Sequence, residues 1–476
     1  MSLISKKHLY RACGLTVVPA LVVFLAFSSA VFAQTLVNPY EGIDWGTINQ
    51  YKANLHTHSL ESDGALTPGQ AIDEYANRDY DILALTDHRK CTYPWEDWGR
   101  DPVALGMLDI PGCEFSNHNH LNGFFIDYTT NPNTEVESLT EIAAQGGLAH
   151  LNHPGNYWNP DSAGNVPDEV IRKYIAWFSD FPPSVLMGME VINKTNLHPE
   201  DEKLWDALLG VMMPERPVWG FANDDMHGPW LGPVRLVEVS WETFLAGSLD
   251  ATAIRNAMLN GSFFFSTCAT QLDPGFWDVN QVPKITEILH DEESGTISIS
   301  AISGGAPLPE SDYKWISMGE VVQTGRVLDY RNTDGVGNYV RAELEGTGGT
   351  TYTNPFGIIR DDGRLVVYVS PADAIYAGAK WKIEGAAAWH EHADTVQLAP
   401  GNYKVIFGRA DSYQTPVPIT VTVTANKTTL VTSAQGAQYV YDPAMTLPAG
   451  GGIALALSGL ALLLAGVRRA NHRHTA

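Results

Sequence analysis

The feature that most constrains this chain is where its histidines and carboxylates stand, because they repeatedly follow short apolar segments. The segments and their followers are residues 81–86 with Asp87 and His88, 107–113 with Glu114, 148–152 with His153, and 218–222 with Asp225 and His227. Helical patterns separate the segments, which predicts repeated βα units around a parallel sheet or barrel. In a βα barrel the carboxyl ends of the strands share one face, so we expect these side chains to converge on one pocket.

A further pair, His56 and His58, stands two positions apart on a predicted short strand. Side chains of a strand repeat with period two, so both rings project to the same face. Asp63 follows where the chain turns through Gly64. Together these nitrogen and oxygen ligands suit zinc, iron or manganese. An isolated pair is also typical of surface histidines, so the metal interpretation depends on the other strand-end residues.

Helix signals fill the intervals between the predicted strands. Thr67 and Gln70 form a capping box with Pro68 at the first helical position, and Ser138 with Glu141 predicts another helix start. Further helices are predicted at residues 199–209 and 249–259, the latter closed by Gly261, and one more strand at 187–192. The pattern predicts an α/β fold over the first half of the chain.

Both ends of the chain carry apolar segments with basic flanks. Lys6, Lys7 and Arg11 precede residues 15–32, and the small residues before Gln34 predict a signal peptide over 1–33, with a retained anchor as the alternative. Residues 447–467 are long enough to cross a bilayer, and the tail to 476 is basic. We therefore expect an exported protein, periplasmic or at the cell surface, tethered at its C-terminus or processed there by a sorting protease. A permanent anchor is the plain alternative for the tail.

The 54 acidic against 30 basic residues give a formal net charge of −24. Such a chain repels polyanions, which argues against nucleic acid as a main partner. Cys91, Cys113 and Cys268 follow the predicted signal peptide without a Cys-x-x-Cys pattern, so neither a disulfide framework nor a cysteine zinc site is predicted.

Taken together, these motifs resemble the PHP (polymerase and histidinol phosphatase) superfamily. The matching segments are His56-x-His58 with Asp63, Leu85-Thr86-Asp87-His88, Gly112-Cys113-Glu114-Phe115-Ser116, His153-Pro154 and Asp225-x-His227. The resemblance covers residues 50 to about 265 and implies a distorted (βα)7 barrel with two or three divalent metal ions, Zn, Mn or Fe. Most known branches of the superfamily hydrolyse phosphoesters.

The resemblance also implies a division of ligands among three ions. One ion would take His56, His58, Glu114 and Asp225; a second would share Glu114 and add His120 and His153; a third would use Asp63, His88 and His227. The implied nucleophile is a metal-bound hydroxide held by Glu114 and Asp225. Asp87 is expected to orient a ligand histidine.

Several neighbouring residues compete for these roles. His118 is the alternative to His120, His150 to His153, and Asp224 to Asp225, while Glu190 either lines the pocket or is a buried structural carboxylate. Substrate anions would meet Arg89 and Lys194, with Lys90 beside them, although solvated loop charges are an equal reading. Four tryptophans, Trp95, Trp98, Trp158 and Trp230, are candidates for the pocket wall or for the core.

Beyond the predicted barrel domain of residues 34–275, residues 276–362 predict a β-rich extension and 363–440 a small β-sandwich. Asn260-Gly261-Ser262-Phe263 and Tyr339-Val340-Arg341-Ala342-Glu343 resemble segments of the carbaryl-hydrolase-like branch of the superfamily. We expect an exported metal-dependent phosphoesterase for a small phosphate ester. The alternatives are a carbamate or carboxylic ester hydrolase with the same site, and a non-catalytic surface binding protein with structural metals.

Overall fold

The computed structural model describes residues 36–194, 196–231, 234–268 and 278–445. Within these ranges no helix combines the length and apolar character needed to cross a bilayer. The predicted signal peptide at 1–33, the predicted membrane or sorting segment at 447–467 and the predicted domain boundary at 275–276 lie outside the described residues.

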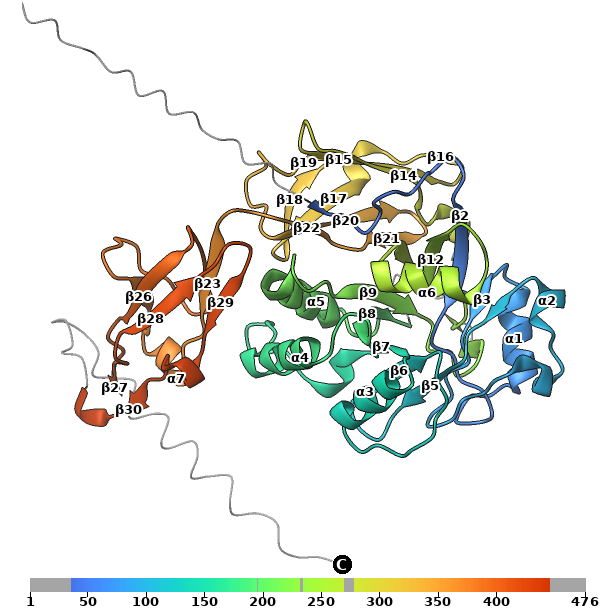
Figure 1. The fold of residues 1–476 in the computed structure, drawn as a ribbon, viewed down its shortest axis with the longest axis horizontal. Coiled ribbons are helices and arrows are strands. Elements are labelled where there is room, and N and C mark those ends of the chain that lie inside the picture. The colour runs from blue at the N-terminus through green and yellow to red at the C-terminus, as the bar shows by residue number, and fades with distance from the viewer. Residues whose placement is uncertain (1–35, 195, 232–233, 269–277, 446–476) are drawn as a thin grey trace, which may run out of the picture. The chain divides into compact units, whose positions relative to one another are not determined.

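Two sheets carry the first half of the chain (Figure 1). A five-stranded sheet has the order β5 (Gly112–Phe115), β6 (Leu121–Phe124), β7 (Leu148–Leu151), β8 (Leu186–Asn193) and β9 (Trp219–Asn223). β7, β8 and β9 run parallel, whereas β6 is antiparallel to both β5 and β7. The βα pattern is thus interrupted by one hairpin that the sequence did not predict.

The larger sheet has eleven strands, and it joins the first half of the chain to the predicted extension. Its main order is β1 (Leu36–Val37), β22 (Phe356–Ile358), β20 (Tyr339–Gly346), β21 (Gly349–Thr353), β13 (Phe263–Thr267), β12 (Ser240–Ala246), β2 (Asn49–Asn54), β3 (Ile82–Leu83) and β4 (Leu108–Asp109), with β17 (Tyr313–Ser317) and β18 (Glu320–Thr324) beside β20. Because β13 pairs with β21, the extension continues the sheet by hydrogen bonds.

Two isolated parallel bridges connect the two sheets where the predicted ligands lie. Thr57, after β2, pairs with Met226, after β9; His88, after β3, pairs with Glu114 in β5. The carboxyl ends of these strands are thereby held together. A closed (βα)7 barrel remains a prediction.

The helices begin and end at recognisable sequence signals. Their bounds are α1 Pro68–Ala76, α2 Pro102–Leu105, α3 Glu135–Ala144, α4 Asp168–Asp180, α5 Glu200–Met212, α6 Ala251–Asn260 and α7 Ala372–Tyr376. The capping box of Thr67 and Gln70 is confirmed, and α6 ends at Gly261 with φ 69°. The predicted helix start at Ser138 is wrong, since Thr134 caps α3 and Ser138 is buried inside it. α3 packs beside β7, and α5 beside β8.

The predicted strands are shorter or divided in places. Residues 81–86 contain only β3, and residues 107–113 divide into β4 and the start of β5. The division has a consequence for the site, because Glu114 stands within β5 and not after it.

The remaining sheets lie later in the chain. One contains β14 (Lys284–Asp291), β15 (Thr296–Ser303), β16 (Ala306–Pro307) and β19 (Val327–Asp329). Two three-stranded sheets follow, with β23 (Gly363–Val367), β25 (Thr395–Leu398) and β29 (Thr428–Val431) in one and β24 (Trp381–Ile383), β26 (Gly401–Phe407) and β28 (Ile419–Val423) in the other. One buried apolar cluster includes Leu365 and Val431 of the first and Val405 and Val423 of the second. The two-stranded pairs are β10 (Trp230–Leu231) with β11 (Val234–Arg235) and β27 (Tyr413–Gln414) with β30 (Val440–Tyr441). The β-sandwich itself stays a prediction.

Candidate metal centre

His56 and His58 lie on an extended segment that is fixed from both sides. The His58 N–H donates to the Met226 carbonyl at 2.9 Å, and the Leu55 N–H donates to Asn223 Oδ1 at 2.7 Å. Both imidazole rings are buried, and their Nε2 atoms lie 3.2 Å apart. The structure therefore places the two rings on one face, as the period of a strand predicts.

Glu114 is the central carboxylate of the cluster. It is fully buried in β5, and five imidazoles from four segments of the chain face it. Its Oε1 lies 3.3 Å from His56 Nε2, 3.0 Å from His120 Nδ1 and 3.5 Å from His153 Nε2, and its Oε2 lies 2.6 Å from His88 Nδ1 and 3.7 Å from His58 Nε2.

Asp225 is the second buried carboxylate, and its two oxygens face different partners. Oδ1 lies 3.2 Å from His58 Nε2, 3.3 Å from His227 Nδ1 and 3.5 Å from His56 Nε2. Oδ2 lies 3.0 Å from Lys194 Nζ. One oxygen therefore faces the histidines, and the other holds a cationic side chain beside them.

Asp63 belongs to the same cluster but lies nearer the surface, with its side chain 54% exposed. Its Oδ1 is 3.4 Å from His227 Nε2, and its Oδ2 is 3.4 Å from His88 Nε2. All nine predicted ligands are thus brought together. Together with Glu190, their donor atoms form overlapping sets that could hold a metal ion: His58, Asp63, His88 and His227; His56, His58 and Asp225; His88, Glu114 and His120; and His56, His153 and Glu190.

Unpaired polar atoms inside the cluster test whether these residues fit a cation. Glu114 Oε2, Asp225 Oδ1 and His88 Nδ1 are buried and form no well-aligned hydrogen bond, although His88 Nδ1 and Glu114 Oε2 lie 2.6 Å apart. Unpaired buried oxygens of this kind are costly, and a bound cation would compensate them. The mixture of imidazole nitrogen and carboxylate oxygen suits divalent zinc, manganese or iron. The donor set therefore fits divalent metal ions.

The electrostatics of the cluster favour ionised carboxylates. Burial would raise the pKa of Glu114 and of Asp225, yet the surrounding histidines, His56 foremost, hold both pKa values well below the usual range. Burial would lower the pKa of His56, but Asp225, Glu190 and Glu114 raise it well above its usual value. The centre is thus a concentration of negative charge that attracts cations.

Glu190 orients His56, which decides between the two readings of this carboxylate. Glu190 Oε1 accepts from His56 Nδ1 at 2.8 Å, so in the neutral ring that binds a cation the lone pair lies at Nε2, on the side of Glu114 and Asp225. Glu190 Oε2 accepts from the backbone N–H of His153 at 2.9 Å. Both oxygens of Glu190 already accept hydrogen bonds, so Glu190 holds His56 and His153 in place.

Side-chain amides also support the cluster, and sequence reasoning missed them. Asn152 Nδ2 donates to Glu114 Oε1 at 2.7 Å, and Asn156 Nδ2 lies 2.9 Å from His153 Nδ1. Asn152 stands at the end of a predicted strand next to His153, which was an available signal. Asparagine is common in loops, so the sequence carried no signal that Asn156 would support the site.

Asp87, predicted to orient a ligand histidine, reaches His58 through the Ser62 hydroxyl, which lies 3.3 Å from His58 Nδ1. Its carboxylate accepts from the Ser59 N–H at 2.7 Å, from Ser59 Oγ at 2.6 Å, from Ser62 Oγ at 2.6 Å and from Thr92 Oγ1 at 2.6 Å. These described bonds include none to a histidine ring. Asp87 therefore fixes the loop between His58 and Asp63 and acts on His58 through the Ser62 hydroxyl and the Ser59 backbone.

The competing residues are engaged elsewhere. His118 bonds Ser138 Oγ and the Asn119 carbonyl, both at 2.6 Å. His150 is buried between Phe124 and Phe221, and Asp224 accepts the backbone N–H groups of Glu238, Val239 and Ser240. The structure thus brings His120, His153 and Asp225 into the cluster in preference to their neighbours.

Two cationic side chains border the centre. Lys194 contacts Asp225 as described, and the exposed Arg89 donates to Ser116 Oγ at 3.2 Å. Lys90 instead pairs with Glu61.

Of the candidate wall residues, Trp95 and Trp158 are buried in apolar clusters, Trp98 is half-buried, and Trp230 is 57% exposed.

The backbone is strained at four positions of the site. Asp225, His153, Arg89 and Lys194 have φ values of 43°, 27°, 54° and 52°. Non-glycine residues adopt this left-handed region at a cost, and such residues cluster at functional sites. Three of them, His153, Lys194 and Asp225, stand within two residues of the end of β7, β8 or β9, and Arg89 directly follows the bridge residue His88.

No family model matches the chain. The 3',5'-nucleoside bisphosphate phosphatase of Chromobacterium violaceum is 40% identical over 79 residues, which are 16% of this chain and 27% of that protein. The chain thus matches about a quarter of the length of this curated relative.

A two-domain protein from Bacteroides vulgatus, named as containing a predicted PHP-like metal-dependent phosphoesterase, has a TM-score of 0.37 at 18% identity, covering 66% of this chain and 96% of that chain. An amidohydrolase from Chromobacterium violaceum with bound sulfate has a TM-score of 0.29 at 19% identity, covering 37% and 88%.

Proposed function

We propose that this chain is a metal-dependent phosphoesterase that acts on a small phosphate ester. The observation that carries the proposal is the cluster of nine histidine and carboxylate ligands that includes the buried carboxylates of Glu114 and Asp225. Divalent ions held there would acidify water and polarise a phosphoryl oxygen. The short match to a nucleoside bisphosphate phosphatase supports a phosphate ester as the substrate.

The chain's own residues would bind and orient the phosphate. Lys194 has three N–H donors, its side chain is 30% exposed, and Asp225 Oδ2 holds it at 3.0 Å. Its remaining donors are available to an anionic oxygen. Arg89, on the other side of His88, would add a second contact, for which its planar guanidinium is suited. Glu190 and Asn152 would keep the ligands oriented.

The finer expectations about the fold and location are part of this proposal. The bridges between Thr57 and Met226 and between His88 and Glu114 support a distorted (βα)7 barrel. The basic and apolar ends of the sequence support export, with a C-terminal tail that anchors or is processed. The paired three-stranded sheets around one apolar cluster support a C-terminal β-sandwich.

The test is a substrate panel on protein stripped of metal and reloaded with Zn, Mn or Fe. We expect metal-dependent release of phosphate from phosphomonoesters or phosphodiesters, and inhibition by inorganic phosphate. Arg89→Ala and Lys194→Ala should each raise KM at least tenfold, whereas Arg172→Ala, which removes a surface arginine beside Asp168, should not.

Cleavage of aryl carboxylic esters or carbamates, with no response to phosphate or to Arg89→Ala, would contradict the phosphoesterase proposal in favour of an ester hydrolase. Absence of bound metal in protein purified without chelator would contradict both catalytic readings.

A further inference from the structure

Two cysteines that are 22 positions apart in the sequence, Cys91 and Cys113, lie side by side in the fold. The Cys91 Sγ is within hydrogen-bond distance of two carbonyl oxygens, that of Gly112 at 3.3 Å and that of Ile126 at 3.1 Å. The Gly112 carbonyl belongs to the peptide bond that joins Gly112 to Cys113. The Cys91 sulfur therefore lies directly beside the backbone of Cys113.

The side chains of the pair also meet. Successive side chains of β5 alternate between the two faces of its sheet, so Cys113 projects away from the face that Glu114 occupies. Cys113 is part of a buried apolar cluster, and Cys91 packs against the same cluster. There, burial and a hydrogen bond with Cys91 raise the pKa of the Cys113 thiol well above its usual value. The two thiols are thus in contact, on the opposite face of β5 from the metal centre.

The two thiols differ in their access to solvent. Cys113 is fully buried, whereas Cys91 is half-buried. Cys91 lines a pocket of about 390 Å³, together with Tyr93, Phe125 and Asp127 among others. A small molecule that enters this pocket therefore meets the Cys91 sulfur first, and Cys113 stands behind it.

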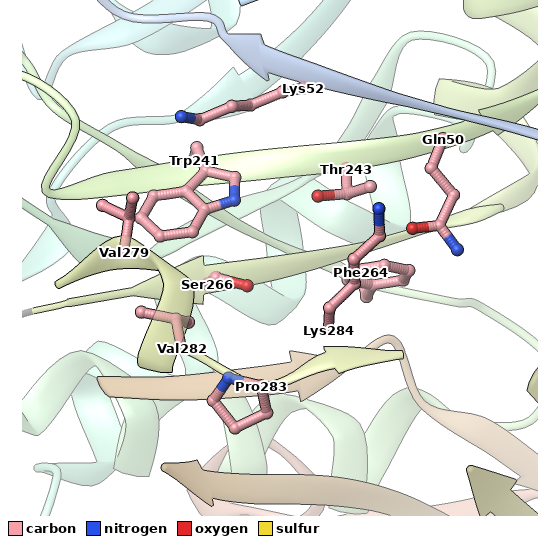
Figure 2. Close-up of a pocket in the computed structure, with 10 residues that line it drawn as sticks. All are labelled: Gln50, Lys52, Trp241, Thr243, Phe264, Ser266, Val279, Val282, Pro283 and Lys284. Atoms are coloured by element: carbon pink, nitrogen blue, oxygen red, sulfur yellow. The ribbon is translucent and has the colours of Figure 1, made fainter. Parts of the chain in front are cut away.

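Cys268 has different surroundings and provides an internal comparison. It is buried in an apolar cluster with Trp241 and Val282, whereas Cys91 and Cys113 belong to another cluster. Trp241 and Val282 line the pocket drawn in Figure 2, but Cys268 is not among the residues that line it. Cys268 is thus shielded from a reagent that would reach Cys91.

We propose that Cys91 and Cys113 are a redox-active pair, which a low-molecular-weight disulfide converts to an intramolecular disulfide. The Cys91 thiolate attacks one sulfur of the small disulfide, forms a mixed disulfide and releases one small thiolate. The Cys113 sulfur then attacks the Cys91 sulfur, closes the protein disulfide and releases the second small thiolate. The protons of the two protein thiols pass to the released thiolates, so one small disulfide is reduced to two thiols while two protein thiols are oxidised.

The position of the bond has a consequence for the site. His88 and Glu114 face each other across an isolated bridge, and the cysteines stand three residues after His88 and one residue before Glu114. A covalent bond here would stabilise the folded state by restricting the unfolded chain. Because disulfides persist in oxidising compartments, an exported protein would carry the bond and a cytosolic one would not.

The test is oxidation of the folded full chain with glutathione disulfide, followed by alkylation and tryptic digestion without reduction. Trypsin cleaves after Lys90 and Arg100, so peptides 91–100 and 101–172 stay joined only through the proposed bond. We expect mass spectrometry to find this joined species and to lose it after reduction. The oxidised protein should also unfold at a higher urea concentration than the reduced protein.

Three variants separate the two steps of the exchange. Cys113→Ala should stop after the first step and retain glutathione on Cys91, because the second thiol is missing. Cys91→Ala should retain no glutathione, since Cys113 is fully buried. Cys268→Ala is the matched control, and it should form the bond as the unchanged protein does.

Three results would overturn the proposal: no joined peptide after oxidation, a bond from either member of the pair to another cysteine, or glutathione on Cys113 in the Cys91→Ala variant. If a variant does not fold, the digest of the unchanged protein decides alone. The outcome is independent of the proposed phosphoesterase activity, because neither a phosphate ester nor a metal ion takes part in the exchange.

Discussion

His150 offers a quantitative test of how the strands beneath the metal centre are packed. The ring is fully buried, neither nitrogen has a hydrogen-bond partner, and its centroid lies 5.2 Å from that of Phe124 and 4.8 Å from that of Phe221. Burial, opposed only in part by Glu190, lowers the pKa of His150 from 6.5 to about 4. The folded protein therefore holds this histidine neutral where the unfolded chain would protonate it.

The size of the effect follows from proton linkage. The unfolded state binds more protons than the folded state between pH 6.5 and about 4, so the stability is fully present above pH 6.5 and is lost as the pH falls. Going from pH 7.5 to pH 5 should cost about 2 kcal/mol of unfolding free energy through His150 alone. His150→Phe removes the titrating group and keeps an aromatic ring between its two neighbours.

The assay is urea unfolding followed by tryptophan fluorescence at pH 5 and pH 7.5, for both proteins at the same metal content. Histidines of the metal centre titrate in both proteins, so only the difference in pH dependence is attributed to His150. We expect the loss of stability toward pH 5 to be smaller by about 2 kcal/mol in the variant. His150→Leu should give the same difference, although the leucine side chain differs in volume from that of phenylalanine. Equal pH dependence in all three proteins would refute a neutral, desolvated His150.

Three further substitutions probe the centre and its support. Glu190→Gln should weaken metal affinity about 10- to 100-fold, because the carboxylate that orients His56 is lost, and metal titration would show no change if that contact were incidental. Asp63→Ala should lower the metal content by one ion per chain in elemental analysis while the other ions remain; a protein emptied of all metal would contradict the predicted division of ligands. Arg341→Met should destabilise the fold by about 3 to 5 kcal/mol in urea unfolding, since it removes the guanidinium that bonds Asp206 at 2.7 and 2.8 Å and leaves that buried carboxylate with the neutral Tyr339 hydroxyl. A loss below 1 kcal/mol would mean that the pair is not buried in solution.

Local signals predicted those elements whose ends depend on local chemistry. The capping box at Thr67 located the start of α1, and the glycine at 261 located the end of α6. α3 shows the limit of this reasoning, because Thr134 and Ser138 are both followed three residues later by glutamate. Tertiary contacts decide between them, since Ser138 is buried against His118 and only Thr134 is free to cap. The antiparallel β6 was missed for a similar reason, as its direction depends on its pairing with β5 and β7.

The site was predictable where a residue type and a strand end coincide. His153 and Asp225 were found in this way, and the structure brings both into the cluster. Supporting groups were harder to assign because their role depends on which neighbour they face. Asp87 stands at a strand end like a ligand, yet its oxygens face serine and threonine hydroxyls. The sequence contains no signal for that difference.

The protonation of the two ring nitrogens of His58 limits which of the overlapping ligand sets can be occupied together. Its Nε2 lies 3.2 Å from Asp225 Oδ1, while its Nδ1 lies 3.3 Å from Ser62 Oγ and 3.6 Å from Asp63 Oδ1. A neutral imidazole has one lone-pair nitrogen, so His58 can bind a cation through only one of these sides. If Nε2 binds the ion shared with His56 and Asp225, Nδ1 carries the proton and donates toward Ser62. Asp63, with His88 and His227, is then left to a separate ion, which is the division that the Asp63→Ala experiment tests.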